Sequence, residues 1–590
     1  MPAGPSARAL TAALFDDGPA PTHEHWRKIV STEAFRHREG LSTAERAALS
    51  YERLRVLDEE IPCAEELARD PRTLAAMHEW TATVDGGLAT VAGIHYNLFL
   101  GSLLDSADAG HGAPRTDLAQ FAGLGRTGTF LCTERDHGND AAALETTATL
   151  DPESGGFVLH TPHEGAQKFM PNTSPIGGPK SAVVAARLLA AGRDQGVFLF
   201  LTPLTDRHGP LPGVRITPLP ERTGTPVDHC ATSFQHVRLP RTALVEGRHG
   251  WFGPDGEFRS ELGSARKRFL HAIGRVTTGK LCMSACALGA ARAALAIAVR
   301  YAGRRHISGP VAGLRIPLAA HRSHHGRLLE GLATAYAMTF LHRSVVRRWV
   351  AHEPAERATV ERLVAIAKGW ISWRARSVAI ECRERCGAQG LFPVNGLAAF
   401  PADMEGAITA EGDNLAVWCK AASEMIFGHE PAGPAPSVGP DPDDLVRLRG
   451  LLAAAERIWH ARARQGLRAG PAGDPIGRWN NAVAAALEVV GAHACLQAAD
   501  AFAEAVATIP DPATRGLLSA LCRLFLLREI SGSSGDLLAD GHLSAEQVRA
   551  LPAEIEEVTA RLAPHLATLA EAFDLPEEHL ADLPMLAGAR

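Results

Sequence analysis

Several sequence features that mark common classes of protein are missing from this chain. Its formal net charge is only −6 over 590 residues, so it lacks the excess of Lys and Arg that nucleic-acid-binding domains carry. The N-terminal segment MPAGPSARALTAALFDDGPA has no apolar core long enough for a signal peptide. The most apolar stretch, LCMSACALGAARAALAIAV, contains Arg292 and is flanked by Lys280 and Arg300, which favours a buried helix. We therefore expect no nucleic-acid partner and no membrane span.

Signs of disulfide chemistry are missing as well. The ten cysteines form no CxxC pair. Cys282 and Cys286, like Cys382 and Cys386, are spaced one helical turn apart, which is typical of reduced cysteines in a protein core. The final residues, LAGAR, carry no peroxisomal address. These features together predict a cytoplasmic protein.

The order of helical and strand-like segments predicts an α+β protein in five parts. Residues 1–126 show the apolar spacing of helices, and residues 127–255 contain short β-like runs such as GTFLCTE and GVFLFLTPL between turns. Residues 256–428 form long helices that we expect to pack as a bundle. A Pro/Gly-rich linker, 429–443, leads to a second helical domain, 444–590.

Two segments of the β region could contact a ligand. In CTERDHGNDAAALETTATLD, Thr133 and Glu134 end an apolar run, and Gly138 lets the backbone turn. A turn of this kind at a strand end can offer backbone N–H groups and a hydroxyl to a planar polar ligand. In QKFMPNTSPIGG, Phe169 precedes a proline turn, where the ring could lie against a ligand or fill a core.

The helical regions contain further candidates, each with an ordinary alternative. The adjacent arginines of YAGRRHISG could clamp a phosphate, or could simply suit the C-terminus of a helix. His321, His324 and His325 share one helical face. No carboxylate has the same spacing, so polar surface residues are the favoured interpretation and no metal site is predicted. Gly387 and Gly390 in RCGAQGLFPVNG end a helix.

The segment ITAEGDNLAV raises the question of what Glu411 does. A carboxylate near the start of a helix is common, because it suits the positive end of the helix dipole. The same carboxylate could act as a base. These ten residues alone favour the first interpretation. P-loop, Rossmann, GxSxG and HExxH signatures are all missing from the chain.

Taken in order along the chain, the segments resemble one enzyme family. TERDHGNDAAALETTATLDPESGGFVLHTP, QKFMPN, PLPGVRITPL, AVRYAGRRHISG, RCGAQGLFPVNG and AEGDN are similar to segments of the acyl-CoA oxidases, a branch of the acyl-CoA dehydrogenase superfamily. The resemblance covers roughly residues 85–425. It implies an N-terminal helical domain, a central β domain, a helical bundle and an additional C-terminal helical domain. It also implies FAD bound between the β domain and the bundle, in a homodimer whose partner subunit reaches the cofactor.

The resemblance also implies roles for single residues. Glu411 matches the catalytic base, and Thr133 matches the threonine that hydrogen-bonds the isoalloxazine. Arg305 matches the arginine that reaches the FAD pyrophosphate of the other subunit. The remaining residues assigned to cofactor binding are Gly138, Phe169, Asn172, Gly387 and Gly390.

The chain departs from the family pattern at several of these positions. Phe169 and Met170 replace the tryptophan pair beside the flavin, and Asn172 stands where the family has a glycine. Ile307 replaces a glutamine. His321-Arg322-Ser323-His324-His325 replaces a Tyr-Gln-Thr-Gln-Gln stretch, and Gly387-Ala388-Gln389-Gly390 replaces a glycine-glycine-His-Gly run.

The implied reaction is α,β-dehydrogenation of an acyl thioester, either an acyl-CoA or an acyl-carrier-protein. Glu411 removes an α-proton, the β-hydrogen leaves as hydride to FAD, and O₂ accepts the electrons to give H₂O₂ and a trans-2-enoyl thioester. A dehydrogenase that passes electrons to a flavoprotein is the main alternative. A flavin monooxygenase of the same fold is less favoured, because the base is present. The Ala- and Arg-rich composition indicates a high-GC bacterium, in fatty-acid degradation or a specialised biosynthetic pathway.

Overall fold

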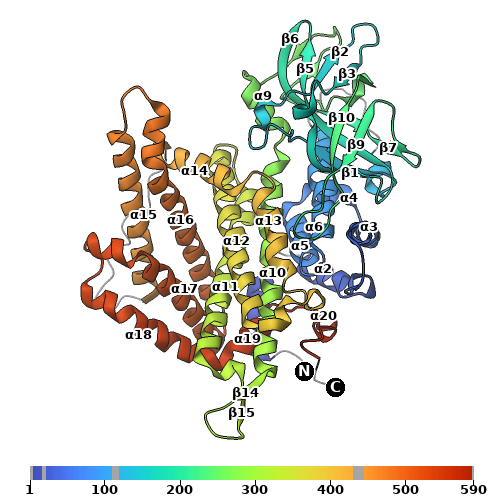
Figure 1. The fold of residues 1–590 in the computed structure, drawn as a ribbon. Coiled ribbons are helices and arrows are strands. Elements are labelled where there is room, and N and C mark those ends of the chain that lie inside the picture. Colours follow the sequence, from blue (N-terminus) through green and yellow to red (C-terminus); the bar gives the residue numbers. More distant parts are fainter. Residues whose placement is uncertain (1–3, 16–21, 109–117, 429–443, 588–590) are drawn as a thin grey trace. The chain divides into compact units, whose positions relative to one another are not determined.

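The protein has the predicted α+β architecture, in which helices precede and follow a β region along the chain (Figure 1). The computed structural model describes residues 4–15, 22–108, 118–428 and 444–587. These residues form two compact units. The first consists of Met1–Arg27 with Met283–Arg590, and the second of Lys28–Cys282. The linker predicted over 429–443 lies outside the described residues, and the five-part domain division stays a prediction.

The second unit begins with helices whose ends are set by capping residues. Ser42 and Glu45 form a reciprocal capping box at the start of α3 (Thr43–Glu59). Residues 63–84 lie in the region predicted to be helical, and the structure divides them between two helices. Asp70 accepts hydrogen bonds from Arg72 N and Thr73 N, and Pro71 stands first in the new helix. The helices of this unit are α3, α4 (Ala64–Arg69), α5 (Pro71–Thr81), α6 (Gly86–Ala92), the π-helical η2 (Gly93–Leu100), α7 (Gly101–Asp108), α8 (Ala119–Ala122) and α9 (Ala265–Ala272).

The β region of this unit contains two main sheets. The larger has the order β1-β5-β2-β3-β11, with β6 paired to β5, and the smaller has the order β4-β10-β9. Apolar side chains from both sheets fill the core, among them Phe157, Phe200 and Phe234. The strands are β1 (Thr127–Leu131), β2 (Thr147–Leu150), β3 (Phe157–His160), β4 (Lys168–Asn172), β5 (Lys180–Ala190), β6 (Arg193–Pro203), β7 (Thr205–Asp206), β8 (Gly209–Pro210), β9 (Val214–Pro218), β10 (His229–Phe234), β11 (Val237–Leu239), β12 (Trp251–Phe252) and β13 (Phe258–Arg259).

The first unit is a bundle of long helices followed by a second helical region (Figure 1). Helix α12 (Arg357–Arg385) packs against α11, α13, α14 and α16, so it lies at the centre of this unit. The other helices are α1 (Pro5–Phe15), α2 (Thr22–Val30), α10 (Arg275–Arg304), α11 (Arg322–Ala351), α13 (Ala399–Thr409), α14 (Asn414–Gly428), α15 (Asp444–Ala469), α16 (Pro475–Thr508), α17 (Pro512–Ala539), α18 (Ala545–Leu562), α19 (Leu566–Glu571) and α20 (Glu577–Ala581). A hairpin of β14 (His306–Ser308) and β15 (Arg315–Pro317) follows α10.

Three helical stretches are long and apolar enough to cross a membrane, by length and composition only. They are Gly86–Ser106, Arg275–Arg304 and Pro475–Thr508, and 89%, 89% and 50% of their most apolar windows are buried inside the protein. The apolar stretch around Arg292 therefore forms a largely interior helix, as its sequence predicts. The expectation that the chain has no membrane span stays a prediction.

Candidate active site

The predicted site residues are divided between the two compact units. Thr133, Gly138, Phe169 and Asn172 belong to the unit Lys28–Cys282. The other four, Arg305, Gly387, Gly390 and Glu411, belong to the unit that contains Met283–Arg590.

Glu411 lies in a turn with an unusual backbone. The turn joins α13, which ends at Thr409, to α14, which begins at Asn414. Glu411 has φ 58° and Gly412 has φ 92°, so two successive residues are left-handed. A non-glycine residue in this region costs on the order of 1–3 kcal/mol, and such residues cluster at functional sites. At Gly412 a Cβ would also approach Val417 Cγ1 to 2.8 Å, so glycine is required there.

A buried lysine holds this turn from α12. Lys368 has no exposed surface. Its ammonium donates hydrogen bonds to Ile408 O at 2.8 Å and to Gly412 O at 2.9 Å. The two carbonyls flank Glu411 in the chain. Lys368 therefore bridges the turn on both sides of the carboxylate and stabilises its strained backbone.

A second contact fixes the far end of the turn to the same helix. The buried Asn414 donates from Nδ2 to Ser372 Oγ at 2.9 Å. Ser372 in turn donates to Lys368 O at 2.8 Å. Lys368 and Ser372 are four residues apart and share one face of α12. Helix α12 therefore positions the whole segment that carries Glu411.

Close packing of α14 on α12 supports this arrangement. Trp418 Nε1 donates to Ile366 O at 3.1 Å. Gly369 provides the space for the indole, because a Cβ there would come within 2.1 Å of Trp418 Nε1. The Glu411 turn thus lies on two helices that cannot shift independently.

In the other unit, Thr133 and Phe169 lie beside each other. Thr133 follows β1, and its carbonyl accepts a hydrogen bond from Phe169 N at 2.9 Å. Thr133 is exposed, and Phe169 and Met170 expose 36% and 38% of their surface. Met170 is left-handed, with φ 64°. An exposed hydroxyl beside two exposed apolar side chains fits the edge and the face of a planar heterocycle such as a flavin.

A buried ion pair fixes this exposed group. Glu134 accepts hydrogen bonds from Glu145 N at 2.7 Å and Thr146 N at 2.9 Å, and from Lys168 Nζ at 2.9 Å. Burial opposes the charged carboxylate, but Lys168 and the N–H donors outweigh it and hold the pKa of Glu134 below its usual range. The pair links β4 to the loop after β1, which keeps Thr133 and Phe169 together.

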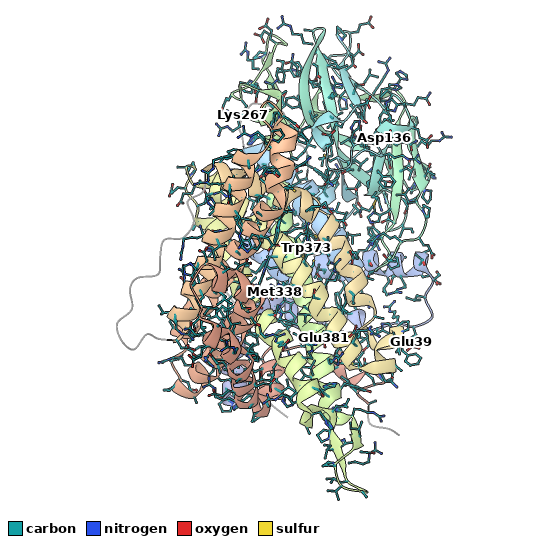
Figure 2. The ribbon with its side chains drawn as sticks, turned by 60° about the vertical axis from the view of Figure 1, so that its left-hand side comes forward. Glu39, Asp136, Lys267, Met338, Trp373 and Glu381 are labelled. Carbon is teal, nitrogen blue, oxygen red and sulfur yellow. The ribbon has the colours of Figure 1, made fainter. Side chains whose placement is uncertain are left out.

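The turn after Glu134 does not depend on Gly138. The left-handed residue is Asn139, with φ 56°, and a Cβ on Gly138 would meet nothing within 4 Å. The chain does turn at Gly138 and Asn139, as expected, but the turn does not require glycine at position 138. Asn tolerates this conformation because its short side chain hydrogen-bonds locally. Gly138 and its neighbour Asp136 are both exposed (Figure 2).

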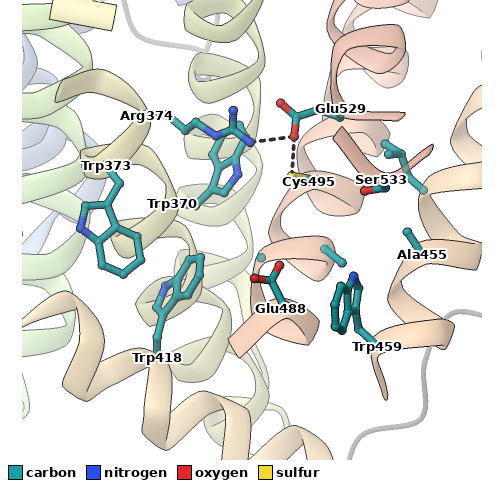
Figure 3. Close-up of a pocket in the computed structure, with 13 residues that line it drawn as sticks. Trp370, Trp373, Arg374, Trp418, Ala455, Trp459, Glu488, Cys495, Glu529 and Ser533 are labelled. Carbon is teal, nitrogen blue, oxygen red and sulfur yellow. Dashed lines mark hydrogen bonds and ion pairs between the residues drawn. The ribbon is translucent and has the colours of Figure 1, made fainter. Parts of the chain in front are cut away.

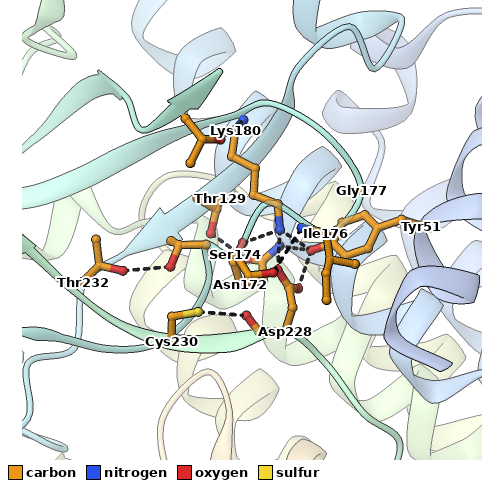
Figure 4. A network of polar contacts seen from close by, with 12 residues as sticks. Tyr51, Thr129, Asn172, Ser174, Ile176, Gly177, Lys180, Asp228, Cys230 and Thr232 are labelled. Carbon is orange, nitrogen blue, oxygen red and sulfur yellow. Dashed lines mark hydrogen bonds and ion pairs between the residues drawn. The ribbon is translucent and has the colours of Figure 1, made fainter. Parts of the chain in front are cut away.

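Asn172 faces the protein interior and is not available to a cofactor. It is fully buried. Its Nδ2 donates to Tyr51 Oη at 3.0 Å, and its Oδ1 accepts from Thr129 Oγ1 at 2.5 Å (Figure 4). Both amide atoms are therefore used inside the protein, which corrects the expectation of a cofactor contact from this side chain.

Asn172 is part of a larger buried network in this unit. Lys180 Nζ donates to Asp228 Oδ2 at 2.5 Å and to Tyr51 Oη at 2.8 Å, and Tyr51 donates to Asp228 Oδ1 at 2.6 Å (Figure 4). Burial lowers the pKa of Lys180, while Asp228 opposes that shift. The network ties helix α3 to the strand β5 and to the segment before β10.

Of the two adjacent arginines, only Arg305 is free to bind an anion. Arg304 Nη1 donates to Leu586 O within its own chain. Arg305 is exposed, and its guanidinium has no ion pair with any residue that the structure describes. Its backbone is held by Tyr301 O and Leu318 N at 2.8 Å each. The side chain therefore extends from a fixed point between α10 and the β14–β15 hairpin.

The local backbone explains why Gly387 and Gly390 are both glycine. Gly387 has φ 57° and follows the last residues of α12, the usual position of a left-handed glycine at a helix end. At Gly390 a Cβ would approach Arg383 O to 2.4 Å. Glycine is therefore required at both positions whether or not an adenine lies nearby.

The three histidines of HRSHH do not converge. His321 is the N-cap residue of α11, His324 Nε2 lies 3.0 Å from Arg385 O, and His325 Nδ1 lies 2.9 Å from Ala319 O. No group of three or more His, Cys, Asp and Glu that could hold a metal occurs within the described ranges. These histidines link the start of α11 to its surroundings.

Two family models match the helical part of this chain. The model described as Acyl-CoA oxidase, C-alpha1 domain, matches residues 274–426, and the model described as Acyl-CoA oxidase matches residues 452–581. Acyl-coenzyme A oxidase 2, peroxisomal, from Arabidopsis thaliana is 28% identical over 561 residues, which cover 88% of this chain and 80% of the relative. An acyl-coenzyme A oxidase-like protein from Mus musculus is 30% identical over 58% of this chain and 55% of the relative.

Solved structures share the fold. Acyl-CoA oxidase1 from Yarrowia lipolytica superposes with a TM-score of 0.83 at 21% identity, over 98% of this chain and 89% of that one. Acyl-CoA oxidase-1 from Caenorhabditis elegans, complexed with FAD and ATP, gives a TM-score of 0.81 at 20% identity, over 97% and 90%. The predicted arrangement of helical, β and additional C-terminal helical regions is confirmed.

The names of the curated relatives show that the prediction of a cytoplasmic protein is wrong. Relatives from Arabidopsis thaliana, Homo sapiens and Bos taurus are named as peroxisomal enzymes, and these names contradict a cytoplasmic location. The prediction rested partly on reduced cysteines, and all ten are indeed free. Free thiols exclude only compartments where disulfides form, so they do not distinguish the cytoplasm from other reducing compartments.

Together the two family matches cover most of the helical bundle and of the second C-terminal helical region. The relatives extend the similarity over most of the remaining chain. These findings show that the chain is similar to acyl-CoA oxidases along most of its length.

Proposed function

We propose that this protein is an FAD-dependent acyl-CoA oxidase that uses Glu411 as the base. It converts an acyl-CoA to the trans-2-enoyl-CoA and reduces O₂ to H₂O₂. One observation carries the assignment of the base. Glu411 has a strained left-handed backbone, and Lys368 holds the carbonyls on both sides of it.

The chain's own residues account for the proton-transfer step. A carboxylate can remove the α-proton of a thioester when it is held within hydrogen-bond reach. Lys368 and Ser372 fix the turn to α12, so the Glu411 carboxylate starts from one defined backbone position. Correct positioning of a catalytic group reduces the entropy lost on reaching the transition state. Bound FAD supplies the acceptor for the β-hydrogen.

Four residues are proposed to hold the cofactor. Thr133 offers an exposed hydroxyl, and Phe169 and Met170 offer exposed apolar surface beside it. Arg305 offers a guanidinium with five N–H donors that suit a pyrophosphate. None of these contacts requires a covalent bond, so we expect FAD to be released by denaturation.

A homodimer is proposed because of exposed apolar residues near the ends of α10 and α12. Val311 and Leu314, in the β14–β15 hairpin, expose 62% and 48% of their surface, and Leu391 and Phe392, after α12, expose 60% and 54%. Apolar residues exposed in groups often mark protein interfaces. A second copy that covers the hairpin would also bring a protein surface close to Arg305.

An acyl-CoA is favoured over an acyl-carrier-protein as substrate, because the relatives described above are named for acyl-coenzyme A. A panel of saturated thioesters, each on CoA and on a carrier protein, tests the assignment. If CoA thioesters yield H₂O₂ and enoyl product at equal rates, the assignment is supported. Turnover only in the presence of a dye acceptor would favour a dehydrogenase.

A further inference from the structure

A cavity lined by four tryptophans lies between the bundle and the second helical region, inside one compact unit (Figure 3). Its volume is about 230 Å³. Helix α12 contributes Trp370 and Trp373, α14 contributes Trp418, and α15 contributes Trp459. The chain has only nine tryptophans, so nearly half of them gather at one cavity, which is unusual for ordinary core packing.

Small side chains opposite the indoles leave the space open. On α16, Glu488, Gly491, Ala492 and Cys495 line the cavity, and their spacing places them on one face of the helix. Ala455 on α15 adds another small side chain. Protein interiors pack closely and contain few voids larger than a water molecule. This hollow is partly open to solvent and has room for a small organic molecule.

Two of the four indoles already carry a cation: Arg374 lies 5.5 Å from the Trp370 ring centroid, and Arg462 lies 4.6 Å from the Trp459 ring centroid. Trp373 and Trp418 meet edge to face, with ring centroids 4.8 Å apart and planes at 79°. Trp418 and Trp459 lie on opposite sides of Glu488 (Figure 3). Indole faces carry negative electrostatic potential and attract cations within about 6 Å of the ring centroid. The arrangement favours a positively charged guest.

The charged residues of the lining favour the same kind of guest. Arg374 is already neutralised by Glu529, with Nη2 to Oε2 at 2.7 Å, and Cys495 Sγ donates to the same carboxylate atom at 3.2 Å (Figure 3). Burial opposes the charged guanidinium, but Glu529 outweighs it and raises the pKa of Arg374. Glu488 is exposed and has no ion pair or hydrogen bond within the described part of the chain. One cation and two carboxylates give the lining a net charge of −1.

We propose that this cavity binds a small organic cation, a quaternary or primary ammonium compound, between the indoles and Glu488. The indole faces surround the apolar groups next to the nitrogen, and Glu488 balances its charge. Anions are disfavoured because Arg374 is already paired. Glu411 does not line this cavity, although Trp418 both lines it and packs α14 against α12.

Calorimetric titration of the FAD-loaded protein with choline and tetramethylammonium tests the proposal. Choline should bind saturably, and its uncharged carbon isostere, neohexyl alcohol, should bind at least tenfold more weakly, since a buried cation–π contact contributes about 2 kcal/mol. Equal affinity for the isostere, or no saturable heat with either cation, would overturn the proposal.

Variants locate the binding at the cavity. Glu488→Gln and Trp459→Leu should each weaken choline binding by at least tenfold. Glu504→Gln and Trp479→Leu are controls, because both residues lie on α16 but outside the lining, and they should leave the affinity unchanged. Glu488 is exposed, so its substitution should not affect folding. Unchanged choline affinity in Glu488→Gln would contradict the assigned site.

Discussion

At the scale of single residues, Glu411 is the position where sequence and backbone geometry agree. The sequence suggested a base by resemblance alone, and the ten residues around it favoured a solvated charge. The left-handed φ of 58° adds an independent physical indication, because strain of this kind persists only where the surroundings enforce it.

The first prediction concerns the carboxylate of Glu411. Glu411→Gln should retain the fold and FAD but lose about 10²–10⁴-fold in the rate of flavin reduction by substrate, because the amide cannot accept the α-proton. Stopped-flow absorbance measures that rate. The control is Glu405→Gln, on α13, whose exposed carboxylate pairs with Arg376 at 2.9 Å. A normal reduction rate in Glu411→Gln would exclude it as the base.

Lys368 could not be identified from the sequence as a positioning residue. It lies in the apolar segment LVAIAKGWIS, and a lysine between apolar neighbours is the only signal. Its partners are backbone carbonyls of a segment forty residues away or more. Backbone acceptors leave no trace in side-chain patterns, so only the structure identifies the contact.

The second prediction concerns this lysine. Lys368→Met keeps much of the apolar volume but leaves two carbonyls without their donor, which should cost about 1–3 kcal/mol each if they stay buried. We expect a lower Tm and a fall of at least tenfold in kcat, with a smaller change in KM. Lys420→Met, which removes an exposed lysine paired with Glu424 at 2.6 Å, is the control. If Lys368→Met changes only Tm, the positioning role is refuted.

At the scale of elements, local signals located most helices and strands but not their exact ends. Strands β1 and β6 occur where the turn-bounded apolar runs GTFLCTE and GVFLFLTPL predict them. Strand β4 escaped prediction, because KFMPN contains a proline and lacks alternation. The division between α4 and α5 also escaped, although Asp70-Pro71 is a strong start signal for a helix.

The third prediction concerns the buried network that joins α3 to the sheets. Asp228→Asn leaves the Lys180 ammonium buried without its anion, which should lower the free energy of unfolding by about 3–5 kcal/mol. Urea unfolding followed by circular dichroism measures this. Glu52→Gln is the control, since Glu52 adjoins Tyr51 but forms only a surface pair with Arg38 at 3.4 Å, which contributes about 0–1 kcal/mol. A similar loss for both variants would contradict the role of the network.

At the scale of the whole molecule, the sequence resemblance predicted the family and the order of its regions. It could not predict which of the matched residues have side chains that are available to a cofactor. Asn172 aligned with a flavin-contacting position, yet its amide is committed to Tyr51 and Thr129. Such commitments depend on residues far apart in the chain, so they follow from the fold and not from a local motif.

The fourth prediction concerns assembly. The protein should sediment as a dimer, and Arg305→Ala should weaken FAD binding by at least tenfold through loss of contacts to the pyrophosphate. Flavin retained after gel filtration reports the affinity. Arg327→Ala is the control, because Arg327 is exposed but pairs with Glu330 at 3.8 Å. A stable monomer that retains all its flavin would contradict a cofactor site that depends on the second subunit.

The most direct test of the proposed function is one anaerobic experiment. The FAD-loaded protein is mixed without oxygen with a saturated acyl-CoA, and then with air-saturated buffer, while flavin absorbance and H₂O₂ are followed. We predict rapid bleaching by the substrate, and then rapid reoxidation that yields one H₂O₂ per flavin. Bleaching followed by reoxidation over many minutes, with fast transfer to a dye acceptor, would contradict the oxidase assignment. If no acyl-CoA bleaches the flavin, the proposed reaction itself is contradicted.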